Sequence, residues 1–255
     1  MYTPYSRRPM RSLLAGLVAA IVVFALIAVS TKALYGFLPA LGVLVGVYFV
    51  LARRFGKKVE ALMEKASTEV QAQRLPNAVA ILKTGYQYAP WVFLMRAQLD
   101  GQVGAFLYLE KKFDDAVPLL EGAWNRHWVA KGMLASHHFR RHKPEIAFEV
   151  LDKALAVAKK EAMLYGLKAF MQVKLKDRDG ARKTLNKGTE VLTSNAALKE
   201  NLIRLQNGED LRMYLFGEAW WQFHLEKPSQ KALMKLAGGG RQALGAKGAK
   251  KAMYR

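Results

Sequence analysis

Few residues in this chain stand at spacings that could do chemistry. His138 and His142 lie one helical turn apart, which is the spacing of a two-histidine metal pair. Basic residues surround the pair at positions 140, 141 and 143, and their charge disfavours a bound cation. Glu145 is the one carboxylate close to the pair in sequence, and the chain has no cysteine, so a full set of ligands is missing. We therefore expect no metal centre.

The sequence also lacks the motifs of nucleotide-binding and catalytic sites. Gly240 and Gly245 have the glycine spacing of a phosphate-binding loop, but Ala246 stands where that loop needs lysine. Neither Ser nor Thr follows Lys247, and the chain contains neither a G-x-S-x-G nor an H-E-x-x-H sequence. We therefore predict a protein that is not an enzyme and that uses no cofactor.

Two uncharged apolar stretches lie near the N-terminus, at residues 12–30 and 34–52. Each is 19 residues long, and a helix of that length rises about 28 Å, close to the roughly 30 Å hydrocarbon core of a bilayer. Only three residues separate them. The pattern predicts a transmembrane helical hairpin over residues 12–52, preceded by a basic N-terminus at residues 1–11.

The positive charge beside these stretches predicts their orientation. Basic residues close to membrane spans stay preferentially in the cytoplasm. The turn carries only Lys32, whereas the two open ends carry Arg or Lys at positions 7, 8, 11, 53, 54, 57 and 58. We expect an inner-membrane protein with two spans, in which both termini and the following domain are cytoplasmic.

A cleaved export signal is the alternative. Ser6-Arg7-Arg8 resembles the start of a twin-arginine signal, and Ala28-Val29-Ser30 has the form of a cleavage site. The first apolar run is longer than the roughly 7–15 residues of a signal core, and a second run follows at once. An uncleaved anchor is the favoured interpretation.

The net charge of +20 is unevenly distributed. Residues 1–56 carry six Lys or Arg and no acid, residues 57–226 carry 26 against 20 acids, and residues 227–255 carry eight and no acid. The central domain thus lacks the strongly basic face of a nucleic-acid-binding protein, and we expect no nucleic-acid partner for it.

Apolar residues from Lys57 to Gln206 recur at three- and four-residue spacing, as in amphipathic helices. Four turns near residues 74–77, 110–113, 141–144 and 177–180 interrupt the pattern. Each turn is followed by a small, a large and a small residue at i, i+4 and i+7. The four copies are Ala78/Leu82/Gly85, Ala116/Leu120/Ala123, Ala147/Leu151/Ala154 and Ala181/Leu185/Gly188, whose first residues are 38, 31 and 34 apart.

This period and signature resemble the tetratricopeptide repeat (TPR), a helix-turn-helix unit of about 34 residues. The second copy matches best, with Gly104, Leu107 and Tyr108 before Phe113-Asp114-Asp115-Ala116, although the usual early aromatic is missing from most copies. The resemblance implies an all-α fold. A TPR-like α-solenoid of about four helix pairs with C-terminal capping helices would occupy residues 57–226. A non-repetitive helical bundle is the alternative.

The resemblance also implies a concave groove, lined by the first helix of each pair, that binds a peptide or helix of another protein. The Lys/Asn clamp with which some members hold a terminal carboxylate is absent, since Met63, Ser67, Gln102 and Met133 occupy matching positions. A mixed basic and apolar lining would favour an acidic, amphipathic partner segment. The candidate partner-binding residues are Arg96, Leu99, Gln102, Phe106, Lys131 and Lys168.

Two further segments follow the repeats. Residues 211–225 gather five aromatic side chains, and we interpret them as a capping helix that seals the last repeat, or alternatively as a helix that lies on the bilayer. Residues 227–255 form a basic tail that we expect to be largely disordered, with three readings: a solubilising end, a contact with anionic lipid, or a contact with RNA. The candidate lipid contacts are Lys231, Lys235, Arg241, Lys247, Lys250, Lys251 and Arg255.

Two functions fit these features. One is a membrane-tethered scaffold or adaptor that binds protein partners through its repeats. The other is an accessory subunit of a membrane protein machine, in which the hairpin makes the specific contacts. The layout is similar to that of a bacterial family associated with late haem synthesis, which places a membrane hairpin before TPR-like repeats. Its characteristic membrane-proximal sequence is not evident in this shorter chain.

Overall fold

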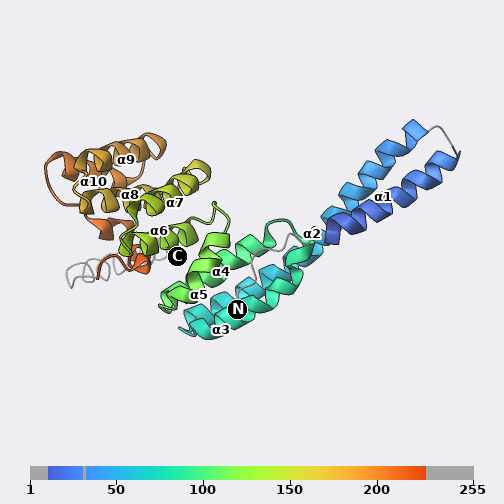
Figure 1. Ribbon diagram of the computed structural model, residues 1–255, viewed down its shortest axis with the longest axis horizontal. Coiled ribbons are helices and arrows are strands. Elements are labelled where there is room, and N and C mark those ends of the chain that lie inside the picture. Colours follow the sequence, from blue (N-terminus) through green and yellow to red (C-terminus); the bar gives the residue numbers. More distant parts are fainter. Residues whose placement is uncertain (1–10, 31–32, 228–255) are drawn as a thin grey trace, which may run out of the picture. The chain divides into compact units, whose positions relative to one another are not determined.

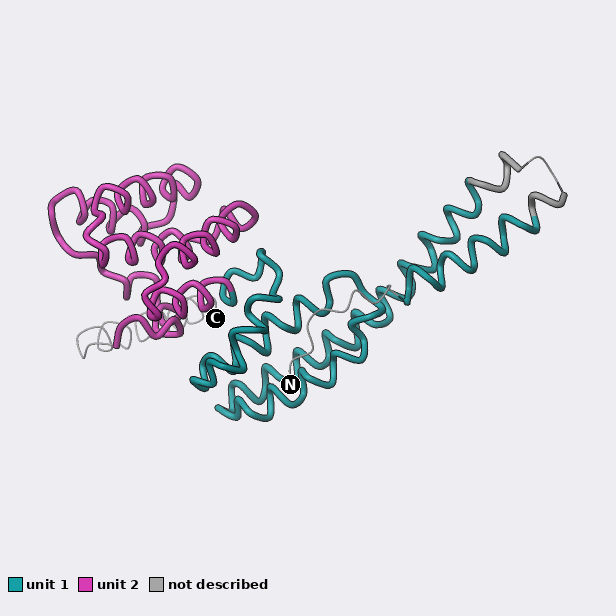
Figure 2. The backbone as a smooth tube through the Cα atoms, in the orientation of Figure 1, with its two compact units in different colours: residues 1–130 teal, residues 131–255 magenta. Residues whose placement is uncertain are grey.

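The structure is a computed structural model, which describes residues 11–30 and 33–227, with side chains for 11–26 and 38–227. The described part of the chain is helical and contains no strand, which confirms the all-α prediction. It divides into two compact units, Met1–Ala130 and Lys131–Arg255 (Figure 2).

The first two helices, α1 (Arg11–Ser30) and α2 (Ala33–Gln71), pack side by side in unit 1 (Figure 1). A Cβ added at Gly16 would lie 3.1 Å from the Leu44 carbonyl oxygen, so glycine allows the two backbones to approach closely here. The glycines of α2 at positions 42 and 46 have no such neighbour within 4 Å. Within the described residues, one helix segment, Leu38–Gln71, is long and apolar enough to cross a membrane, and Arg11–Leu26 is a shorter apolar helix.

Helix α2 does not end where its apolar stretch ends. It continues through Arg53, Gly56 and the charged sequence that follows, as far as Gln71. At about 1.5 Å per residue, its 39 residues extend roughly 58 Å. The boundary predicted between the hairpin and the helical domain, near residue 56, therefore lies inside a helix. A single helix serves as the end of the apolar segment and as the first helix of the first pair.

The rest of unit 1 consists of three α-helices and one 3-10 helix. Helix α3 packs against α2 and against α4, and α4 packs against α5, so that consecutive helices are neighbours. The 3-10 helix η1 follows α3 and contacts both α2 and α1. The bounds are α3 (Leu75–Thr84), η1 (Gly85–Trp91), α4 (Met95–Leu109) and α5 (Phe113–Gly122).

The described part of unit 2 contains two further helix-turn-helix segments, α6–α7 and α8–α9, followed by the helix α10. Helix α8 packs against α7 and α9, and α10 packs against α9. The bounds are α6 (Trp128–Arg140), which begins at the end of unit 1, α7 (Pro144–Val157), α8 (Ala162–Lys174), α9 (Arg178–Val191) and α10 (Ala196–Gln206).

The four turns inside the pairs have the same backbone geometry. Each contains a non-glycine residue in the left-handed region, with φ of 59° to 64°, at Gln73, Lys111, His142 and Lys176. Its N–H donates to the carbonyl three residues back, and the next N–H donates to the carbonyl five residues back, as in a Schellman motif. Helix α10 ends in the same way at Gly208, with φ of 78°. The chain therefore repeats at the level of local geometry.

The small-large-small positions face the interior of both units. All twelve residues of the four copies are buried, and Ala78, Leu120 and Leu151 are among those with no exposed surface. The small residues admit neighbouring side chains: a Cβ added at Gly188 would lie 2.9 Å from Cγ of Tyr165. This confirms the predicted interior face of α3, α5, α7 and α9.

The segment after α10 corrects one prediction. Residues 211–225 do not form an α-helix but two 3-10 helices, η2 (Met213–Phe216) and η3 (Glu218–Phe223). Gly217 separates them with φ of 82°, a conformation that favours glycine and that an α-helix cannot contain. Asn201 of α10 holds the start of this segment, since its amide group bonds both the N–H (2.7 Å) and the carbonyl (3.4 Å) of Arg212.

Candidate partner-binding groove

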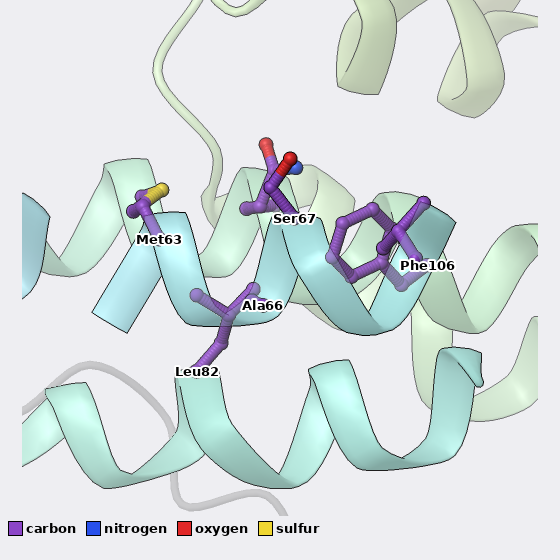
Figure 3. A pocket seen from close by; sticks show the side chains of 7 residues that line it. Met63, Ala66, Ser67, Leu82 and Phe106 are labelled. Carbon is purple, nitrogen blue, oxygen red and sulfur yellow. The ribbon is translucent and has the colours of Figure 1, made fainter. Parts of the chain in front are cut away.

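An open pocket of about 180 Å³ lies on unit 1 between α2, α3 and α4. Met63 and Ser67 project from one side of α2, and Ala66 faces Leu82 of α3 (Figure 3). The spacing of four residues places Met63 and Ser67 on one helix face. The lining residues are Met63, Ala66, Ser67, Val70, Leu82, Gln102 and Phe106.

The lining of this pocket is apolar apart from one hydroxyl and one amide. Ser67 is exposed, and Gln102 accepts a hydrogen bond of 3.3 Å from the His127 ring through its Oε1. The His127 Nδ1 in turn accepts from the Ala130 N–H, which caps the start of α6. None of the described residues that line the pocket is charged. It is therefore suited to an apolar side chain whose neighbouring polar groups bond Ser67 or Gln102.

Two of the six candidate partner-binding residues, Gln102 and Phe106, line this pocket. Leu99 does not, because it is fully buried and its Cδ atoms lie 3.2 and 3.3 Å from a Cβ built on Gly85. This corrects the prediction for Leu99, which is a core residue. Arg96 is partly exposed and lies 3.8 Å from the carboxylate of Asp100.

Asp100 is a buried carboxylate on α4 that no motif had indicated. The Tyr86 hydroxyl donates a hydrogen bond of 2.6 Å to its Oδ1. Burial raises the pKa of Asp100 above its usual 3.8, against the opposing effects of the Tyr86 hydrogen bond and the Arg96 charge. Asp100 is not among the residues of the pocket, so this cluster connects α4 to η1 rather than contributing to binding.

The two candidates in unit 2 do not form an open basic groove. Lys131 is 5% exposed. Lys168 lies 2.5 Å from the Asp152 carboxylate of α7 and 5.9 Å from the centre of the Phe148 ring. The two lysines therefore do not form the basic groove lining that was predicted, because Lys131 is enclosed and Lys168 is ion-paired with Asp152.

Aromatic rings from the segment after α10 pack against α6 and α8, the first helices of unit 2. A Cβ added at Gly132 of α6 would lie 2.6 Å from Phe223, and one added at Gly166 of α8 would lie 2.5 Å from Phe216. Trp220 packs edge-on against Phe170 of α8, with 4.9 Å between ring centres. Trp220 and Phe223 are buried, with 1% and 0% of their surface exposed. They cover the first helices of unit 2 and are not available to a bilayer.

One signal in the sequence could have located these aromatic contacts. Gly132 and Gly166 each precede the left-handed residue of their turn by ten positions, and Gly101 does the same in unit 1. The ring above Gly101 is that of His127, 2.8 Å from a Cβ built there. Met63 occupies the equivalent position before Gln73, and it lines the open pocket.

The histidine pair and the basic tail do not form a binding site among the described residues. Within the described residues, no group of three His, Cys, Asp or Glu side chains could hold a metal ion. His142 is the left-handed residue of its turn. The seven basic residues proposed to contact lipid through the tail, from Lys231 to Arg255, lie outside the described residues.

Comparison with known proteins gives no relative: no family model, no curated protein and no solved structure matches this chain.

Proposed function

We propose that this chain is a non-enzymatic, membrane-tethered scaffold that binds a protein partner through the unit 1 pocket on the cytoplasmic face of the inner membrane. The single observation that carries the proposal is the place of the pocket on α2. The helix whose apolar part is long enough to span a bilayer also supplies Met63, Ala66, Ser67 and Val70 to the pocket. Tether and binding surface are thus parts of one rigid element.

The chemistry of the pocket supports an amphipathic partner segment. An apolar side chain of the partner would fill the space between Ala66, Leu82 and Phe106. The acidic character predicted for the partner depended on a basic groove lining, and none of the described residues that line this pocket is charged, so the proposal does not include it. A TPR-like arrangement in unit 1, with the first helices α2 and α4 facing the partner, accommodates this mode of binding.

A photo-crosslinking experiment tests the pocket. Benzoylphenylalanine is placed at Ser67 in the full chain in its native membrane, and at Thr68 as the matched control, since Thr68 is exposed on the same helix but does not line the pocket. We expect a discrete protein adduct after irradiation with the Ser67 variant and none with the Thr68 variant. Equal adducts at both positions, or none at either, would contradict partner binding at the pocket.

A subunit of a membrane machine is the second candidate, and one observation favours it. Gly42 and Gly46 leave a small-residue strip on α2 that meets nothing within 4 Å in the described chain, although such strips commonly pack against another helix. Replacing residues 12–52 by an unrelated hairpin in the same helical register separates the candidates. A scaffold keeps its Ser67 adduct and its function, whereas a machine subunit loses its function.

A further inference from the structure

An aromatic cluster lies where the apolar stretch of α2 ends. Phe55 of α2 stacks on Trp91 of η1, with ring centres 4.7 Å apart and planes at 26°, and lies 5.8 Å from the Tyr88 ring. These rings come from segments more than 30 residues apart in the sequence. The rings meet because η1 contacts both α2 and α1. The chain at η1 therefore lies beside the end of the apolar stretch.

Four basic residues accompany the cluster on α2. Lys58 lies 5.6 Å from the centre of the Phe55 ring and 5.4 Å from that of Tyr88. Arg53, Arg54 and Lys57 are exposed. None of the four forms an ion pair with a described residue, and the first acidic residue of the chain is Glu60. Their positive charge is therefore not neutralised within the described part of the protein.

The chain just after η1 adds an exposed apolar ring. Phe93 has 63% of its surface exposed, immediately before Leu94, whose φ of 59° turns the chain into α4. Aromatic rings beside cations at the end of an apolar span match the headgroup layer of a bilayer, where amphipathic rings are enriched. The cytoplasmic leaflet adds a negative surface potential that attracts Lys and Arg close to the membrane.

We infer that α2 residues 53–58 together with η1 and Phe93 form a binding surface, here called the collar, for the headgroups of anionic phospholipids. The inference rests on the proposed membrane tether, which places the end of the apolar stretch at the membrane surface. The phosphates would pair with the four cations, and Trp91 and Phe93 would lie at the level of the glycerol backbone. The collar is separate from the basic tail and requires none of its residues.

Fluorescence quenching of the full chain in lipid nanodiscs tests the collar. Two sets of discs contain the same mixture of phosphatidylcholine and phosphatidylglycerol, with acyl-chain bromine on one lipid or on the other. We expect brominated phosphatidylglycerol to quench the tryptophan signal at least about twofold more strongly than brominated phosphatidylcholine. The excess should disappear in Trp91→Phe, which keeps a ring against Phe55, and it should decrease at high salt.

Matched charge variants locate the effect. Lys57→Gln/Lys58→Gln should reduce the excess, whereas Lys65→Gln/Lys83→Gln, which removes the same charge from exposed sites outside the collar, should not. Phe93→Ser changes only an exposed ring and should reduce it without unfolding the protein. Equal quenching by the two lipids, or an excess that survives in Trp91→Phe, would overturn the collar. Failure of the chain to enter nanodiscs at all would instead overturn the proposed tether.

Discussion

Gly101, Gly132 and Gly166 each provide a flat patch of helix backbone on which an aromatic ring lies. The position is the same in three successive helix pairs, and the ring comes each time from another part of the chain: His127, Phe223 or Phe216. Glycine is needed for the space it leaves and not for its backbone freedom, because all three are helical. Glycine at these three positions therefore allows an aromatic ring to pack directly on the backbone of α4, α6 or α8.

Alanine at Gly132 or Gly166 should destabilise unit 2. Gly132→Ala and Gly166→Ala force a methyl group against the Phe223 or Phe216 ring, and such overpacking costs about 1–3 kcal/mol. Chemical denaturation of the full chain in detergent, followed by circular dichroism, measures the loss. Gly56→Ala is the control: its added Cβ meets nothing within 4 Å, so the higher helix propensity of alanine should stabilise α2 by up to about 1 kcal/mol. The same change in all three variants would contradict the ring contacts.

Asp100 should make stability depend on pH. Because burial raises the pKa of Asp100 in the folded protein above 3.8, the folded state holds the proton more tightly than the unfolded state. This tighter proton binding contributes fully to the free energy of unfolding below pH 3.8, where Asp100 is protonated in both states. The contribution is lost as the pH rises through the raised pKa of the folded protein. Asn cannot lose a proton, so the stability of Asp100→Asn relative to wild type should increase from about pH 4 to pH 6.5. Urea unfolding across this range measures the difference, and a difference that is constant or decreases with pH would contradict it.

The turns within the helix pairs are the clearest repeat at the scale of elements, and none of the four has glycine at its left-handed position. A residue with a Cβ pays a conformational cost there that glycine does not.

Lys176→Gly should therefore stabilise the protein by about 1 kcal/mol, because the φ of 64° suits glycine. Thermal unfolding of the full chain in detergent is the measurement. In the control Lys183→Gly, the glycine falls on the exposed face inside α9 and should cost about 1 kcal/mol. Destabilisation by both substitutions would show that the turn at Lys176 does not have this geometry.

Helix pairing could be predicted from the sequence because small, large and small residues recur with the helical period and mark the buried face of α3, α5, α7 and α9. The end of α2 could not be predicted, because residues 57–65, five of which are charged, form a helix as readily as the apolar stretch does and carry no stop signal. In the segment after α10, aromatic residues alone did not distinguish an α-helix from two 3-10 turns. The ring contacts to Gly132 and Gly166 join residues that are far apart in sequence, and the hydrogen bond from Arg212 to Asn201 spans 11 residues.

For the candidate site, Gln102 and Phe106 were predicted because they lie on a first helix. Leu99 lies on the same face of α4, three residues before Gln102, but it packs against Gly85 and is fully buried. The sequence does not show that this contact closes the pocket before it reaches Leu99. Lys168 was predicted for the same reason, but its ion pair with Asp152, 16 residues earlier on α7, could not be read from the sequence.

At the scale of the whole molecule, the proposed topology predicts where each end of the chain lies. With both termini cytoplasmic, alkaline phosphatase fused after Arg255 should remain inactive, while a fluorescent protein fused there should be bright. Phosphatase inserted in the turn at Lys32 should be active. Phosphatase activity after Arg255, or a mature N-terminus close to Thr31, would contradict the tether and favour the export signal.

The continuity of α2 also fixes how far a partner must reach. Ser67 in the pocket follows Ala52, where the apolar stretch ends, by fifteen positions, and the residues between them form an uninterrupted helix. At about 1.5 Å per residue, the pocket lies at most about 22 Å from the end of the apolar stretch, and a continuous helix connects the two. A partner anchored in the same bilayer would need up to about seven extended residues, at roughly 3.3 Å each, between its own span and its docking segment. Linker length would then discriminate among partners with equally suitable docking segments.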